Sequence, residues 1–143
     1  QGKEFRPLQL GNIEAKRDWS DSEDFMAGVW LMLNQVEPKE YILSSNETHT
    51  VKEFVSLAFQ EAGIAGLWSG EGREEKFRIY EENKILAEIN EEFYRPAEVA
   101  ILHGDSNPIR EELGWEPKFS FKDLVKRMVN NDLEIAEKRA FSP

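Results

Sequence analysis

Apolar positions along the chain alternate between spacings typical of strands and of helices. The alternation at Leu8–Leu10, which ends at the turn signal Gly11-Asn12, predicts a short strand. Ser20 and Glu23 have the spacing of a capping box, so a helix of about four turns is expected from here to Pro38. We expect that helix to be buried through the apolar residues that recur at helical intervals, Phe25, Met26, Val29, Trp30 and Leu33.

The next pattern is a strand followed by a helix. Tyr41–Leu43 is short, apolar and bounded by the polar run Ser44–Glu47, so it is interpreted as a buried strand. Thr50 and Glu53 form a second capping box, before an apolar stripe that stops at Gly63. A strand followed by a helix in this way favours an α/β fold, with short strands and packed helices.

The second half predicts a hairpin and two helices. Residues 77–80 and 85–89 are expected to be its two strands. A short helix over residues 107–113 should stop at Gly114, and a long one should run from Ser120 to about Arg139, with Ser120 and Asp123 as its cap. The long helix is expected to bury Phe121, Leu124, Val125, Met128 and Leu133.

Composition indicates one globular domain over residues 1–143, since 40% of the residues are apolar and can form a core. Cysteine is absent, which excludes thiol chemistry and favours a cytoplasmic location. No apolar run approaches the roughly 20 residues that span a bilayer, so no membrane partner is expected. The net charge of −10 argues against a nucleic-acid partner. Because the chain opens with Gln1, we expect it to be part of a longer protein.

Two separated arginines are the candidate anion-binding residues. Proline restricts the backbone of the residue before it, so Arg95 should lie on a stiff extended segment before Pro96. Arg17, within Lys16–Trp19, precedes the first predicted helix. A guanidinium can hold two phosphate oxygens at once, so the pair could converge on a diphosphate. Glu98 could accept hydrogen bonds from ribose hydroxyls. The same residues would also be found if Arg17 formed a structural ion pair, if Arg95 were an ordinary loop residue and if Glu98 were solvated in a loop.

Other chemistries find little support in the sequence. Tyr80 and Lys84 have the Tyr-x-x-x-Lys spacing of a dehydrogenase, but they fall in the predicted hairpin, where coincidence is the better explanation. No glycine-rich dinucleotide motif occurs, so no cofactor is expected on this segment. His49 and His103 lie far apart, and no metal site is predicted.

Several long motifs, in order from Leu8 onward, closely resemble the C-terminal part of the GDP-mannose 4,6-dehydratase family of extended short-chain dehydrogenase/reductases. They are Leu10–Trp19, Asp24-Phe25, Trp30–Leu33, Asn46–Phe54, Phe93–Val99, Gly104-Asp105, Leu113–Lys118 and Leu124–Val129.

The resemblance implies that this chain is the small substrate-binding lobe of such an enzyme. The family's N-terminal Rossmann lobe, which holds NADP and the catalytic residues, would be missing, so the segment alone would be inactive. The substrate would be GDP-mannose, converted to GDP-4-keto-6-deoxy-mannose on the route to GDP-fucose. By analogy Arg17 and Arg95 would contact the diphosphate and Glu98 the ribose. The Rossmann lobe would be a partner, and the complete enzyme a homo-oligomer.

One short run and one single residue depart from the family's pattern. The run Ser20–Glu23 is more acidic than usual, and Ala100 replaces an aspartate. The added carboxylates could weaken anion binding, or they could cap the helix that follows. A non-catalytic binding module and a sister reductase or epimerase therefore stay open as alternatives to the dehydratase.

Overall fold

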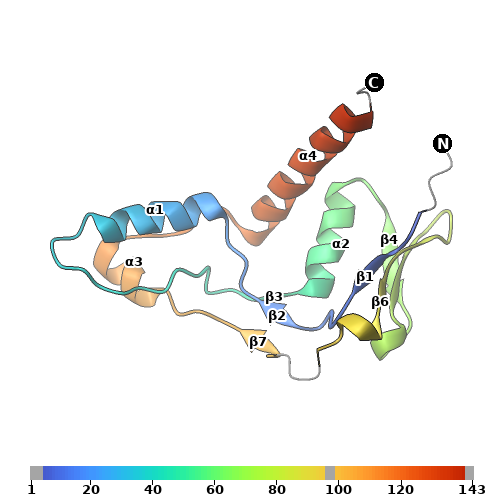
Figure 1. Cartoon of the computed structure of the whole chain (residues 1–143), viewed down its shortest axis with the longest axis horizontal. Coiled ribbons are helices and arrows are strands. Elements are labelled where there is room, and N and C mark those ends of the chain that lie inside the picture. The colour runs from blue at the N-terminus through green and yellow to red at the C-terminus, as the bar shows by residue number, and fades with distance from the viewer. Residues whose placement is uncertain (1–4, 96–98, 141–143) are drawn as a thin grey trace.

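A computed structural model describes residues 5–95 and 99–140 of the chain as an α/β fold with short strands, as predicted (Figure 1). The larger sheet has four strands, of which the first is parallel to its neighbour and the others are antiparallel. In spatial order they are β1 (Leu8–Leu10), β6 (Ile85–Ile89), β5 (Lys76–Ile79) and β4 (Gly66–Ser69). The pairing of β5 with β6 confirms the predicted hairpin.

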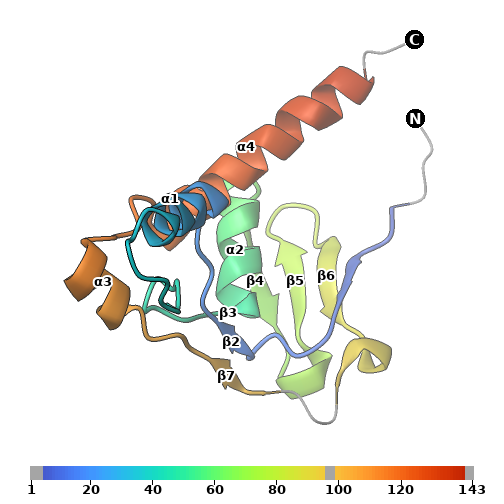
Figure 2. The same ribbon diagram turned by 60° about the vertical axis from the view of Figure 1, so that its left-hand side comes forward.

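A second, smaller sheet brings together three segments that are far apart in the sequence. Its central strand β2 (Lys16–Arg17) pairs antiparallel with β3 (His49–Thr50) and parallel with β7 (Ile101–Leu102). Each strand has two residues, so few ladder hydrogen bonds fix this sheet. In Figures 1 and 2 it lies between the larger sheet and the helices at the opposite end of the molecule.

The main hydrophobic core lies between the larger sheet and helix α2 (Val51–Glu61). Val55 of this helix packs with three buried residues of the sheet, Phe77, Leu86 and Ala87. The ring of Phe59 stacks on Phe77 with centroids 4.6 Å apart, and aromatic pairs at this separation add to the energy of burial. This core fixes the sheet end of the molecule.

The opposite end consists of α1 (Ser22–Leu33) and α3 (Asn107–Leu113), and α4 (Phe121–Ala140) runs out from between the two ends (Figure 2). The indole of Trp115 donates to the carbonyl of Asp24 at 2.8 Å. The Asp24 carboxylate in turn accepts from the backbone N–H groups of Lys118 and Phe119. These bonds attach the α3–α4 connection to the first turn of α1. None of the helices in the described part of the chain is long and apolar enough to cross a bilayer.

The capping boxes predicted at the starts of α2 and α4 are confirmed, because in each the cap residue and the acidic residue three positions later bond to each other. Thr50 and Glu53 form both hydrogen bonds of a capping box at the start of α2. The hydroxyl of Ser120 and the carboxylate of Asp123 do the same at the start of α4. Gly114 ends α3 with a φ of 66°, the left-handed conformation that glycine adopts without strain.

The predicted strand at Tyr41–Leu43 is wrong. Among the described residues neither sheet includes this segment. Its side chains attach the segment to the two helices. The Tyr41 hydroxyl donates to Glu112 of α3 at 2.6 Å, and Leu43 packs so closely on Gly28 of α1 that a Cβ added to Gly28 would lie 2.5 Å from the Leu43 side chain. The segment therefore lies against α1 and α3 and pairs with no strand among the described residues.

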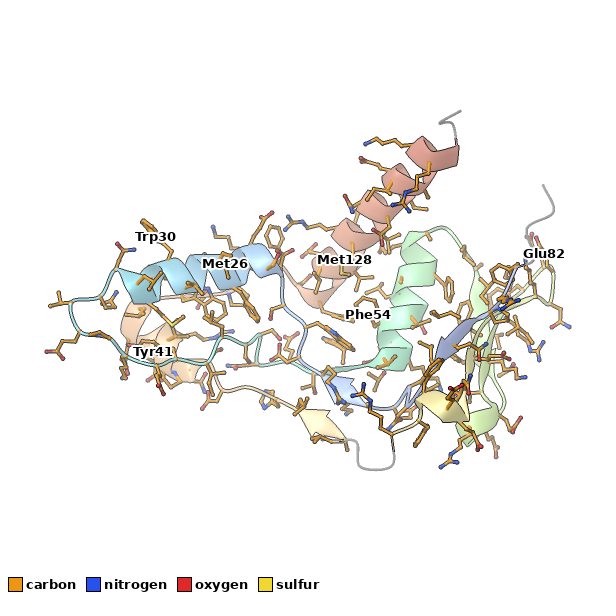
Figure 3. The ribbon with its side chains drawn as sticks, viewed as in Figure 1. Met26, Trp30, Tyr41, Phe54, Glu82 and Met128 are labelled. Carbon is orange, nitrogen blue, oxygen red and sulfur yellow. The ribbon has the colours of Figure 1, made fainter. Side chains whose placement is uncertain are left out.

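The first helix also differs from its prediction in its cap and its burial. It begins after Asp21, whose carboxylate accepts from the N–H of Glu23, so Asp21 and not Ser20 is the cap. It ends at Leu33, well before Pro38. Three of the residues expected to be buried, Met26, Trp30 and Leu33, are exposed. Figure 3 shows Trp30 on the side of α1 that faces away from α3.

In α4, the buried face is shorter than predicted. Val125 is fully buried, and Phe121 packs its ring against Trp19 and Phe54. Met128 and Leu133 are exposed, and the second half of the helix, which contains Leu133, extends beyond the rest of the molecule (Figure 1).

Replacing Val125 by alanine should lower the free energy of unfolding by about 2 kcal/mol, because buried methyl groups are lost and a cavity remains. Val36→Ala is the matched control, since Val36 is 100% exposed, and it should change stability by less than about 0.5 kcal/mol. Urea denaturation of both variants measures the difference. Equal stabilities would show that the burial of Val125 does not support the fold.

Candidate functional site

The structure places Arg17 beside the segment that contains Arg95. Arg17 is on β2, and its Nη1 donates to the carbonyl of Val99 at 2.9 Å and to that of Lys16 at 2.7 Å. Val99 follows Arg95 by a few residues and leads into β7, whose pairing with β2 begins with the N–H of Lys16 donating to Ala100 at 2.8 Å. The two arginine segments, far apart in the sequence, are therefore neighbours.

Arg95 is described and is exposed, whereas Glu98 and Pro96 lie outside the described residues. The backbone leading to Arg95 is anchored to the larger sheet. Asn90 donates its N–H to the carbonyl of Leu10 at 2.8 Å, and its side chain caps the 3-10 helix η2 (Glu91–Phe93). Tyr94 then ends this turn by donating its N–H to Glu91 at 3.0 Å. Arg95 thus leaves a well-anchored turn.

A hollow of about 370 Å³ opens beside Arg17. Its lining combines cationic, acidic, apolar and hydroxyl side chains from β2 and the residue after it, α1, the 43–44 segment, and β7 with the stretch that follows. It includes Arg17, Asp18, Phe25, Leu43, Ser44, Leu102 and His103. Pockets for small ligands are typically apolar with a few polar groups that fix orientation. The hollow has this composition, with a guanidinium at one edge.

The carboxylate of Asp18, next to Arg17, is the most highly bonded acidic group in this region. Its two oxygens accept from the hydroxyls of Ser44 and Ser45 at 2.7 Å each, and from the backbone N–H groups of Ser45 at 3.0 Å and Asn46 at 3.2 Å. Burial raises the pKa of Asp18, but these hydrogen bonds to its ionised form outweigh burial and lower the pKa below its ordinary value. Asp18 therefore holds the 44–46 turn against β2.

The same turn is fixed from its other side by α3. Asn46 has a φ of 64°, in the left-handed region, and its side-chain oxygen accepts from the N–H and the hydroxyl of Ser106 at 3.0 Å each. Arg110 donates Nε to the Ser106 hydroxyl and Nη2 to the carbonyl of Ser45. The guanidinium of Arg110 thus holds the 44–46 turn against α3 and is not a candidate for binding a ligand.

The sequence predicts the two arginines as ligand-binding residues, but it does not predict the hydrogen bonds that join Asp18, the 44–46 turn and α3. In the sequence, the run Ser44–Glu47 is only the polar boundary of the strand predicted at Tyr41–Leu43. Its contacts with Asp18 and Ser106 join residues that are far apart in the chain. An asparagine followed by a capping-box threonine is a turn signal that could have indicated a structured loop. A larger hollow, of about 640 Å³, lies along α2 near His49 and Phe121, and it was not anticipated either.

Within the described residues, no group of three or more histidine, aspartate or glutamate side chains is placed to hold a metal ion. The two histidines lie apart: His49 stacks on Phe121 with ring centroids 3.9 Å apart, and His103 lines the hollow beside Arg17.

A family model described as GDP-mannose 4,6 dehydratase matches residues 1–128. The chain belongs to this family. It is 42% identical over 127 residues to the GDP-mannose 4,6 dehydratase of Dictyostelium discoideum, and the match covers 89% of this chain and 36% of that protein. Against the human GDP-mannose 4,6 dehydratase it is 37% identical over 128 residues, covering 90% of this chain and 34% of the relative. The chain thus spans about a third of the length of these relatives.

Solved structures with a similar fold are matched as well. One is RMD from Pseudomonas aeruginosa complexed with NADPH, with a TM-score of 0.65 and 19% identity, covering 87% of this chain and 35% of the other. Another is the UDP-glucose 4-epimerase of Thermotoga maritima with UDP-glucose, with a TM-score of 0.69 and 18% identity, covering 91% and 36%. At this identity the likeness shows the fold alone.

The acidic residues that depart from the GDP-mannose 4,6 dehydratase pattern have structural partners. Asp21 caps α1 and accepts from Arg127 at 2.8 Å, and Glu23 accepts from Arg127 at 2.6 Å. Arg127 also lies over the ring of Phe119. Of the two explanations for these carboxylates, the structure favours helix capping.

Replacing Asp18 by asparagine should lower the free energy of unfolding by about 2 kcal/mol at pH 7, because a charged acceptor of several hydrogen bonds is lost. The folded pKa of Asp18 is depressed, so its contribution is present above the unfolded value of about 4 and is lost as the pH falls through the lower folded value. Urea denaturation at pH 7 and in steps below about pH 4 should show the difference between wild type and variant shrinking. A constant difference across this range would contradict an ionised Asp18 anchor, and Asp132→Asn in exposed α4 is the control.

Proposed function

We propose that this chain is the substrate-binding part of a GDP-mannose 4,6-dehydratase and that it holds the GDP moiety of GDP-mannose. The family membership supports this assignment. The observation that carries it is the hydrogen bond from Arg17 to the carbonyl of Val99, which brings the two predicted arginine segments together at the edge of a hollow. In this proposal Arg17 and Arg95 bind the diphosphate, and Glu98 binds the ribose.

The charges near the hollow suit an anionic ligand even though the chain carries a net charge of −10. Asp18 lies next to Arg17, but its oxygens are directed at the 44–46 turn, whose hydroxyl and N–H groups saturate them. A guanidinium at the edge of a partly apolar hollow interacts more strongly with phosphate than one in open water. The local arrangement therefore counts for more than the net charge.

Bond-making in the complete enzyme would take place on another lobe. The described helices offer no glycine-rich turn leading into an open N-terminus for a dinucleotide. Instead α1, α2 and α4 begin at side-chain caps from Asp21, Thr50 and Ser120. We assign NADP to an N-terminal Rossmann lobe of a longer protein. The isolated segment would bind substrate without converting it.

The exposed side of α1 is the surface on which we expect that lobe to pack. The helix is apolar on both sides: Phe25 meets Trp115 inside the molecule, while Met26, Trp30 and Leu33 are exposed. A helix that is apolar all round is normally buried. Ile42, in the neighbouring segment that lacks a sheet partner, is exposed as well. We also infer a cytoplasmic homo-oligomer for the complete protein.

In the full-length protein, Arg95→Ala should weaken GDP-mannose binding by roughly 30-fold or more, since a charge-assisted contact to a desolvated phosphate is removed. Isothermal calorimetry measures the change. Arg139→Ala, an exposed arginine near the end of α4, is the matched control and should bind normally. Unchanged affinity in Arg95→Ala would rule out the assignment. Product analysis with GDP-mannose separates a dehydratase from a reductase, an epimerase or a binding module.

Trp30→Ser should barely change the stability of the 143-residue chain, because the Trp30 side chain is 69% exposed. In the full-length protein the same change should lower stability by about 3 kcal/mol or more, because a buried tryptophan would be lost from the contact between lobes. Thermal unfolding of both lengths makes the comparison. Tyr80→Ser, at an exposed aromatic near the sheet end, is the control. If the two substitutions have the same effect in the full-length protein, α1 is not the packing surface.

A further inference from the structure

Arg73 projects from the turn between β4 and β5, and glycines fix the shape of this turn. Gly70 has a φ of 102° and Gly72 a φ of 54°, both in the left-handed region. A Cβ at Gly70 would lie 2.5 Å from the carbonyl oxygen of Glu74. The tight turn continues into the 3-10 helix η1 (Gly72–Glu74), which contains Arg73.

The Arg73 side chain reaches across to the turn that precedes Arg95. Its guanidinium carbon lies 4.6 Å from the centroid of the Tyr94 ring, within the range of a cation–π interaction. Its Nη1 donates to the carboxylate of Glu91 at 3.0 Å. Arg73 is 58% exposed and Glu91 77% exposed, so this ion pair adds little to global stability. Its effect is on the local geometry of η2.

The peptide that carries Arg95 is consequently held from two sides. On one side, the carbonyl of Phe93 lies so close to Gly11 that a Cβ there would be 2.3 Å from its oxygen. On the other, Arg73 covers the ring of Tyr94, the residue directly before Arg95. Side-chain order at Tyr94 limits the directions in which Arg95 can leave the turn.

We propose that Arg73 is a positioning residue for the diphosphate of the nucleotide sugar. It stacks on Tyr94 and so orients Arg95, without touching the ligand itself. This inference rests on the proposed function, because it requires Arg95 to bind the diphosphate. A pre-oriented arginine loses less conformational entropy when it binds, so affinity rises without a new ligand contact.

Charge alone does not account for such a role. Glu91 neutralises Arg73 at 3.0 Å, so the pair presents little net field to an anion nearby. An effect that came from the charge of Arg73 would fade at high ionic strength, whereas restriction of Tyr94 by stacking would persist. The salt dependence of the variants therefore separates the two causes.

The test is a double-mutant cycle in the full-length protein, with GDP-mannose as the probe. Arg73→Ala and Tyr94→Leu should each raise Kd and KM by roughly twofold to fivefold at both low and high salt, with kcat unchanged. The double variant should be no weaker than the weaker single variant, because both substitutions break one contact. Tyr94→Phe keeps the ring, Arg73→Lys keeps a cation over it, and both should retain most of the affinity.

Each alternative result has a definite meaning. Additive effects, effects that vanish at high salt, or a fall in Tm parallel to the loss of affinity would overturn the positioning role. Wild-type affinity in Arg73→Ala together with a large loss in Arg95→Ala would overturn this inference and leave the proposed function intact. If Arg95→Ala itself binds normally, the proposed function and the positioning role both fail. Arg139→Ala again controls for removal of a positive charge.

Discussion

The ionised carboxylate of Asp18 is the interaction on which the candidate site depends most. Directly after Arg17, it receives four hydrogen bonds from the 44–46 turn, two from hydroxyls and two from backbone N–H groups. The turn is bonded in turn to Ser106 and Arg110 at α3. One side chain thus links the strand that carries the candidate ligand-binding arginine to the helical end of the molecule.

The bonds to Asp18 are important because few backbone hydrogen bonds join the short strands of the smaller sheet. Strands β2, β3 and β7 have two residues each, and Ile101 and Leu102 of β7 are both exposed. In a longer sheet the backbone hydrogen bonds would fix the position of Arg17. Here side chains do so, and the loss of one charged acceptor should have a larger effect than the removal of a ladder hydrogen bond.

The sequence predicted best what depends on neighbouring residues. The reciprocal cap of Thr50 and Glu53 is encoded within four positions, and so is the stop at Gly114. The hairpin of β5 and β6 was predicted because its two strands are close in the sequence. Arg95 beside Pro96 and Arg17 before a helix are also local patterns, and the bond from Arg17 to Val99 brings their segments together, while the ligand-binding role of the two arginines stays a prediction.

The predictions that failed concern which part of the structure packs against an apolar segment. Apolarity predicts that Tyr41–Leu43, Met26 and Trp30 should be buried, but it does not identify the partner. In this chain Leu43 is covered by α1, whereas Met26 and Trp30 are covered by nothing among the described residues. The burial of an apolar helix face thus depends on which partner the fold brings to it, and no pattern of neighbouring residues encodes that partner.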